Sequence, residues 1–145
     1  LWESLEEAKE QVLYGLEQCR ILKISDNEIQ WLTGEEDYTA GVNWIQERYE
    51  IPMILVSMGK AGSRAYYNGL VVEAKPFLQK STIETTGAGD TFCGCVLHYI
   101  CEHGIDGLKE DDLTEMLNFA NVAASIITTR KGALRVMPEQ EEIQQ

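Results

Sequence analysis

The 145-residue sequence has few basic residues and no long hydrophobic run. Lys and Arg number 12 against 24 Asp and Glu, which gives a formal net charge of −12 at pH 7. A nucleic-acid partner would need a basic face, so this balance argues against that class of protein. No apolar stretch approaches membrane-spanning length, and no signal-peptide pattern opens the chain. We therefore expect a cytoplasmic protein without a membrane partner.

The four cysteines lack the spacing of a metal site. They are Cys19, Cys93, Cys95 and Cys101. Cys93 and Cys95 stand two apart on a predicted helix, so they point to different faces. His98 and His103 have no carboxylate–His ligand set around them. We expect buried free thiols in a reducing cytosol.

Several nucleotide-binding and hydrolase motifs are also missing. The phosphate loop G-x-x-x-x-G-K-[ST] and the nucleophile elbow G-x-S-x-G do not occur. The dinucleotide fingerprint G-x-G-x-x-G would require glycine where Phe92 stands, which disfavours an oxidoreductase. The length suits one domain with a real core, so residues 1–145 are interpreted as a single domain. Because the chain begins at Leu1 rather than at methionine, we expect further residues upstream.

Helical and strand patterns alternate along the chain. Helices are expected over residues 2–18, 25–34, 38–49, about 90–102 and 113–128, and strands over 19–24, 53–57, 63–67 and 70–74. Asn68-Gly69 predicts a type I′ hairpin between the last two strands, and Ser25 with Glu28 predicts a capping box. The polar tail 139–145 is expected to fray. This alternation predicts an α/β fold, a Rossmann-like, mostly parallel sheet flanked by helices.

The run from Thr85 to Gly94, Thr-Thr-Gly-Ala-Gly-Asp-Thr-Phe-Cys-Gly, is the most informative stretch. Gly87 and Gly89 let the backbone turn tightly and let an anion approach, and the amides and dipole of the following helix attract it. Asp90 would repel a merely bound phosphate, but it suits a base beside amides that hold a transferring phosphoryl group. This combination predicts phosphoryl transfer to an alcohol. In the alternative interpretation the glycines only make a turn and Asp90 only caps the helix.

Glu84 to Gly94 resembles the signature D-T-x-G-A-G-D-x-F-x-x-G of the ribokinase-like (PfkB) carbohydrate kinases. The resemblance implies that the amides of Gly87, Ala88 and Gly89 form an anion hole and that Asp90 deprotonates a sugar hydroxyl. It implies ATP, Mg²⁺ and a small sugar as ligands, and it leaves a homodimer of the full-length protein open. Because these enzymes are longer and carry their sugar-binding residues mostly in the N-terminal half, the chain resembles the C-terminal, nucleotide-binding half of the ribokinase fold.

A second glycine-containing loop follows the best strand candidate. Ligands in open α/β sheets bind beyond the carboxyl ends of strands. Residues 56–62 resemble the family's T-x-G-x-x-G segment, which implies that Ser57, Gly59 and Gly62 approach ATP. Without a phosphate-loop motif, Lys60 is interpreted as a solvated loop lysine. Asn121 stands where the family places a polar residue beside the adenine; the alternative is an exposed helical asparagine.

Two further segments resemble ion-binding parts of the family. Residues 23–28 resemble K-x-N-x-x-E, which implies that Glu28 organises waters around Mg²⁺ in addition to its capping role. Residues 129–133 resemble a T-R-x-G-A turn that helps to bind a monovalent cation such as K⁺, near Glu84 and Thr86. Glu84 stands where aspartate is usual, which puts K⁺ activation in question.

Leu1-Trp2-Glu3, residues 23–28 and the Gly-Ala-Gly-Asp-Thr-Phe run are most similar to bacterial fructokinases within this family. The expected reaction is transfer of the γ-phosphoryl group of MgATP to D-fructose, which gives fructose 6-phosphate. A ribose, ketogluconate or nucleoside kinase and a truncated, non-catalytic ATP-binding module remain alternatives.

Overall fold

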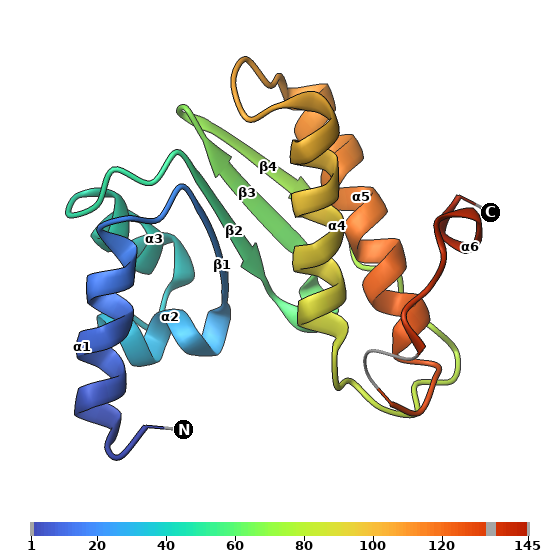
Figure 1. The fold of residues 1–145 in the computed structure, drawn as a ribbon, viewed down its shortest axis with the longest axis horizontal. Helices are drawn as coiled ribbons and strands as arrows, with labels where there is room; N and C mark the ends of the chain where they lie inside the picture. The colour runs from blue at the N-terminus through green and yellow to red at the C-terminus, as the bar shows by residue number, and fades with distance from the viewer. Residues whose placement is uncertain (1, 133–135, 145) are drawn as a thin grey trace. The chain divides into compact units, whose positions relative to one another are not determined.

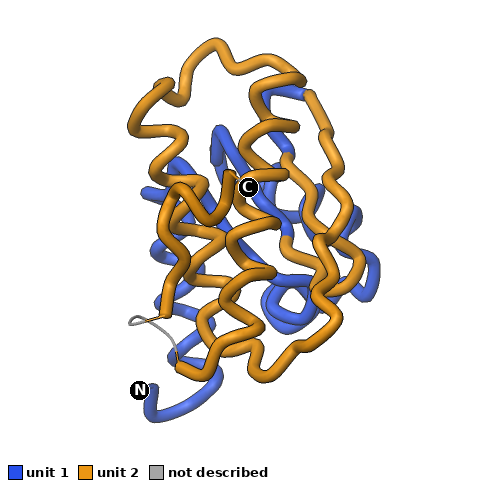
Figure 2. The backbone as a smooth tube through the Cα atoms, turned by 90° about the vertical axis from the view of Figure 1, so that its right-hand side faces the viewer, with its two compact units in different colours: residues 1–56, 66–69 blue, residues 57–65, 70–145 orange. Residues whose placement is uncertain are grey.

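The computed structural model describes residues 2–132 and 136–144. The chain divides into two compact units, one of residues 1–56 and 66–69, the other of residues 57–65 and 70–145 (Figure 2). Within the described ranges, no helix combines the length and the apolar character needed to span a bilayer.

The first unit contains α1 (Leu5–Leu16), β1 (Ile21–Ser25), α2 (Asp26–Thr33), α3 (Tyr38–Gln46) and most of β2 (Met53–Ser57). The predicted capping box is present at α2. The Ser25 hydroxyl accepts a hydrogen bond from the Glu28 amide at 3.3 Å, and the Glu28 carboxylate accepts one from the Ser25 amide at 2.7 Å. Helices α2 and α3 pack closely, because a Cβ atom at Gly41 would lie only 2.1 Å from a methyl carbon of Ile29.

The second unit contains the 3₁₀ turn η1 (Gly59–Ala61), the hairpin strands β3 (Ser63–Tyr67, in part) and β4 (Leu70–Ala74), α4 (Ala88–His103), α5 (Glu110–Ile127) and α6 (Gln140–Ile143). Helices α4 and α5 lie side by side, and α5 packs on β4 (Figure 1). The core between them is apolar. Its fully buried side chains include Val96, Leu113, Met116, Leu117 and Ile127.

Hydrogen bonds join the four strands in the order β1-β2-β3-β4. Asn68 and Gly69 have φ of +46° and +80°, as a type I′ turn requires, so the predicted hairpin is confirmed to the residue. The sheet is mixed and flanked by helices, which confirms the predicted α/β class with one hairpin.

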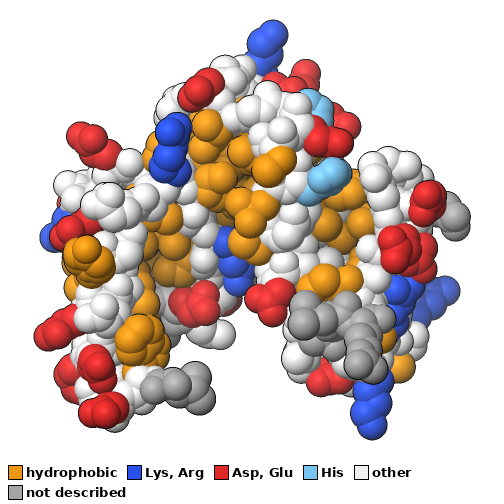
Figure 3. All heavy atoms as spheres, in the orientation of Figure 1, with side chains coloured by type: hydrophobic (Ala, Val, Ile, Leu, Met, Phe, Trp, Pro, Cys, Tyr) orange, Lys and Arg blue, Asp and Glu red, His pale blue; other side chains and the backbone are white. Residues whose placement is uncertain are grey.

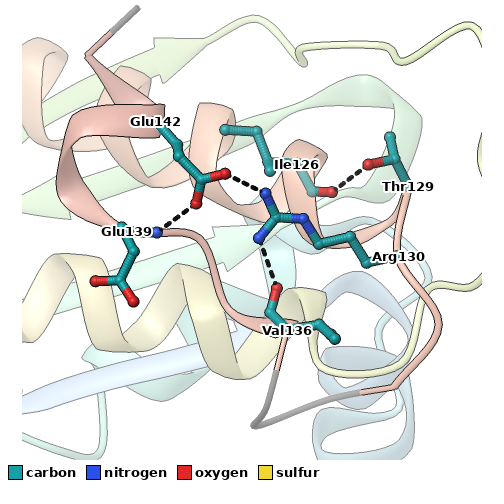
Figure 4. Close-up of polar contacts among 6 residues, drawn as sticks. All are labelled: Ile126, Thr129, Arg130, Val136, Glu139 and Glu142. Carbon is teal, nitrogen blue, oxygen red and sulfur yellow. Dashed lines mark hydrogen bonds and ion pairs between the residues drawn. The ribbon is translucent and has the colours of Figure 1, made fainter.

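Two sequence expectations are wrong. The tail does not fray throughout, because α6 forms and the Arg130 guanidinium donates hydrogen bonds to the Glu142 carboxylate at 2.5 Å and to the Val136 carbonyl at 3.0 Å (Figure 4). The cysteines are free, but they are not all buried: Cys101 is exposed and the other three are half-buried. Burial raises the pKa of the Cys95 thiol to about 11.

Candidate active site

The second unit contains a cavity of about 500 Å³, within the size range of small-molecule sites. The residues that line it come from β2 and η1, from the loop between β4 and α4, and from α4 and α5. All five residues predicted to contact ATP are among them: Ser57, Gly59, Gly62, Gly89 and Asn121. Segments distant in sequence therefore meet at one cavity.

The turn from Met58 to Gly62 is a closed structure. The amides of Ala61 and Gly62 donate to the carbonyls of Met58 and Gly59 at 2.9 and 3.1 Å, and the Met58 amide donates to the Gly62 carbonyl at 2.9 Å. Gly62 has φ of +100°, and a Cβ there would lie 2.2 Å from the Ala74 carbonyl oxygen. Gly59 also has positive φ but faces open space. The two glycines therefore set the shape of this wall of the cavity.

The Asn121 side chain links α5 to the end of β4 by hydrogen bonds. Its side-chain amide donates to the Lys75 carbonyl at 3.1 Å and to the Ala74 carbonyl at 3.5 Å. The residue is only 9% exposed, so the interpretation as an exposed helical asparagine is wrong. The same side chain lines the cavity, and its two hydrogen bonds fix the orientation in which it does so.

The signature run forms the start of α4. Gly87 is the N-cap residue with φ of +81°, and its carbonyl accepts a hydrogen bond from the Thr91 amide at 2.8 Å. The Ala88 amide donates to the Thr85 carbonyl at 3.2 Å. Among residues 2–132 and 136–144, none accepts a hydrogen bond from the amides of Gly87 or Gly89. Because Ala88 and Gly89 line the cavity, the helix begins with unpaired N–H groups at its wall.

Asp90 lies in the first turn of α4 and is exposed. Its carboxylate forms neither an ion pair nor a hydrogen bond with any described residue, and the N-cap position belongs to Gly87. The interpretation in which Asp90 only caps the helix therefore has no contact to support it. An exposed, unpaired carboxylate next to free amides is able to exchange a proton with a ligand.

The structure brings Glu84 to the turn after α5. The Gly132 amide donates to the Glu84 carboxylate at 3.3 Å, and the amides of Ile83 and Glu84 donate to the Thr128 carbonyl at 2.8 and 3.2 Å. The two segments that the resemblance assigns to a monovalent cation are thus neighbours. Thr86 is exposed nearby in sequence, whereas Ala133 of the same turn lies outside the described residues, as does Leu1 of the opening resemblance.

Glu28 lies on α2, in the first unit, whereas the cavity belongs to the second. Partial burial raises the pKa of its carboxyl, but hydrogen bonds from Ser25 and the charge of Lys23 outweigh this, so the pKa of Glu28 is lowered. The carboxylate is therefore ionised at neutral pH, as an acid that orders Mg²⁺ waters must be. No group of three or more His, Cys, Asp and Glu side chains within the described ranges could hold a metal ion by itself.

Several polar residues that line the cavity were not predicted as ligands from the sequence. They are Lys60, Gln79, Thr82, Thr85, Ser125 and Thr128. The Gln79 side chain donates to the Ser125 hydroxyl at 3.1 Å, which in turn donates to the Val122 carbonyl at 2.7 Å. This bridge holds the β4–α4 loop against α5. The loop has no regular secondary structure, so no periodicity in the sequence could have shown which of its side chains face the cavity.

The model of the pfkB family carbohydrate kinases matches residues 1–140. The chain belongs to this family. It is 35% identical to the probable fructokinase-4 of Arabidopsis thaliana over 147 residues, covering 99% of the chain and 44% of that protein. It is 30% identical to the fructokinase of Klebsiella pneumoniae, covering 99% of the chain and 46% of that protein. This pfkB-family chain thus spans less than half the length of these curated relatives.

Solved structures confirm the ribokinase-like fold of this pfkB-family chain. The fructokinase of Vibrio cholerae O395, in a form with fructose, ADP and calcium ion bound, superposes with a TM-score of 0.85 at 25% identity, over 99% of this chain and 46% of that one. The aminoimidazole riboside kinase of Salmonella enterica has a TM-score of 0.84 at 21% identity, over 99% and 47% of the two chains, a likeness of fold alone.

Proposed function

We propose that the full-length protein is an ATP-dependent carbohydrate kinase and that residues 1–145 form its nucleotide-binding and catalytic portion. One observation carries the proposal. A cavity of ligand size gathers the five predicted ATP-contacting residues beside the first turn of a helix whose N-terminal amides are partly free and which carries an unpaired aspartate. Membership of the pfkB family supports the same reaction class.

In the proposed reaction, the γ-phosphoryl group of ATP lies at the start of α4. The amides of Gly87 and Gly89 stabilise the charge that develops on its oxygens, and the Ala88 amide joins them by exchanging its long hydrogen bond to Thr85. Asp90 takes the proton of a sugar hydroxyl. The hydroxyl oxygen then bonds to the γ-phosphorus, the bond to the bridging oxygen breaks, and ADP leaves.

Ions have proposed places in the same scheme. Mg²⁺, when bound, neutralises charge on the phosphate oxygens, and Glu28 would hold waters of its coordination shell. A monovalent cation such as K⁺ would lie against Glu84, Thr86 and the turn after α5. Glu84 already accepts a hydrogen bond from Gly132, so that carboxylate has a structural use independent of the ion. The four free thiols, three of them partly buried, suit the reducing cytoplasm, where we place the protein.

D-fructose is the proposed substrate, phosphorylated at its 6-hydroxyl. Support comes from relatives named fructokinases and from the Vibrio cholerae fructokinase bound to fructose and ADP. The test is ADP release by the full-length protein with MgATP and a panel of fructose, ribose, ketogluconate and nucleosides. We expect the highest kcat/KM with fructose.

The panel separates the alternatives. A preference for another sugar or a nucleoside would change the substrate assignment and leave the proposed phosphoryl transfer intact. Binding of ATP without turnover of any alcohol would indicate a non-catalytic module, an alternative that the partial coverage of the relatives keeps relevant. Failure to bind ATP would refute the proposal altogether.

A further inference from the structure

The cavity has one charged residue among those that line it, Lys60 on the turn η1. The other described residues of its wall are neutral. No acidic side chain in residues 2–132 or 136–144 forms an ion pair with Lys60, whereas Arg48, Arg64 and Arg130 each have an acidic partner. Lys60 is exposed, as expected of a loop lysine, and it is also the charged residue among those that line the cavity.

We propose that Lys60 binds a phosphate group of the nucleotide, an inference that rests on the proposed function. The lysine ammonium is a compact charge with three donors on a flexible stem, and it suits phosphate oxygens at variable positions. Lys60 and the free amide of Gly89 line the same cavity, so a single polyphosphate chain is able to contact both.

The backbone that carries Lys60 is fixed. It lies between Gly59 and Gly62 in the turn closed by the three hydrogen bonds described above. Gly62 is held against the Ala74 carbonyl with no room for a side chain. The stem of Lys60 therefore starts from a defined point, and only its side chain has to be ordered when a ligand binds.

The charge of the whole chain gives this contact its importance. The formal net charge is −12, and acidic side chains are spread over the visible surface (Figure 3). Salt screens distant charges over about 8–10 Å, so the local charge at the cavity decides how a nucleoside di- or triphosphate is held. Lys60 supplies the one full positive charge among the residues that line it.

The test compares Lys60→Gln with Lys80→Gln in the full-length protein. Lys80 is an exposed lysine of the β4–α4 loop that does not line the cavity and has no acidic partner among the described residues. Titration calorimetry measures the Kd of ADP and of adenosine at two salt concentrations. We expect Lys60→Gln to weaken ADP about tenfold, equivalent to about 1.4 kcal/mol. Adenosine affinity should not change, and the salt dependence of ADP binding should become shallower.

Lys60→Arg should retain most of the ADP affinity, and Lys80→Gln should match the wild type for both ligands. Equal ADP affinity in Lys60→Gln and in the wild type would overturn the inference while leaving the proposed kinase intact, because the wild type would still bind ADP. Equal losses of ADP and adenosine would also overturn it, since the substitution would then have altered the cavity. If the wild type binds neither ligand, the proposed function itself fails. Circular dichroism and a thermal melt establish that each variant is folded.

Discussion

Gly62 offers a sharp test of how the cavity wall is built. Its backbone has φ of +100° and ψ of −140°, a region that residues with a Cβ rarely adopt, at a cost of about 1–3 kcal/mol. In Gly62→Ala the new Cβ would lie 2.2 Å from the Ala74 carbonyl oxygen, and relieving such a clash costs a further ~1–3 kcal/mol. Alanine also lowers the conformational entropy of the unfolded chain, which stabilises the folded state by only about 0.4–1 kcal/mol. We expect a net destabilisation of about 3 kcal/mol.

Gly59→Ala in the same turn is the matched control. Gly59 also has positive φ, at +52°, but no atom lies within 4 Å of the position of its Cβ. The left-handed conformation alone costs about 1–2 kcal/mol, partly offset in the unfolded state, so the expected loss is about 1 kcal/mol. Urea unfolding of both variants without nucleotide, followed by circular dichroism, measures the difference. If the two substitutions destabilise the protein equally, the close approach of Gly62 to the hairpin is not rigid and the reasoning is refuted.

Two further predictions concern carboxylates. Asp90→Asn should lower kcat of the full-length protein at least ~10²-fold with little change in the Kd of ATP, and near-normal turnover would remove Asp90 from the mechanism. For Glu28, partial burial raises the pKa of the carboxyl. Hydrogen bonds from Ser25 and the charge of Lys23 lower it by more than burial raises it, so the folded pKa lies below the ordinary 4.5. The stability contributed by its ionised form is then fully present above pH 4.5 and is lost as the pH falls through the folded pKa. The difference in unfolding free energy between wild type and Glu28→Gln should therefore shrink from about pH 7 to about pH 3, and a constant difference would contradict this assignment.

Local signals in the sequence were sufficient to predict much of the fold. Asn68-Gly69 fixes the hairpin because both residues accept positive φ, and Ser25 with Glu28 fixes the start of α2 through their own hydrogen bonds. Helix boundaries were less well predicted. Helix α5 begins at Glu110, before the first apolar residue of its pattern, because an acidic first turn is stabilised by the helix dipole and leaves no hydrophobic signal.

Contacts between distant residues account for what the sequence could not show. The burial of Asn121 depends on carbonyls at the end of β4, and α6 is held by Arg130. Lys60 is the exposed loop lysine that the sequence predicted, but its place at the cavity depends on the distant loop between β4 and α4, which lines the same cavity. The signature run was recognisable because its glycines and its aspartate are adjacent in sequence, whereas the cavity as a whole is assembled from separate segments.

The ion pair between Arg130 and Glu142 determines where the C-terminal part of the chain tolerates trimming. Arg130 belongs to the same turn whose Gly132 amide holds Glu84, immediately before the signature run. Trimming the chain after Val136 would remove the Glu142 carboxylate, so the Arg130 guanidinium would lose its acidic partner and keep its hydrogen bond to the Val136 carbonyl. The turn whose Gly132 amide donates to Glu84 would then lose its ion pair with α6, although none of the removed residues belongs to the proposed catalytic machinery.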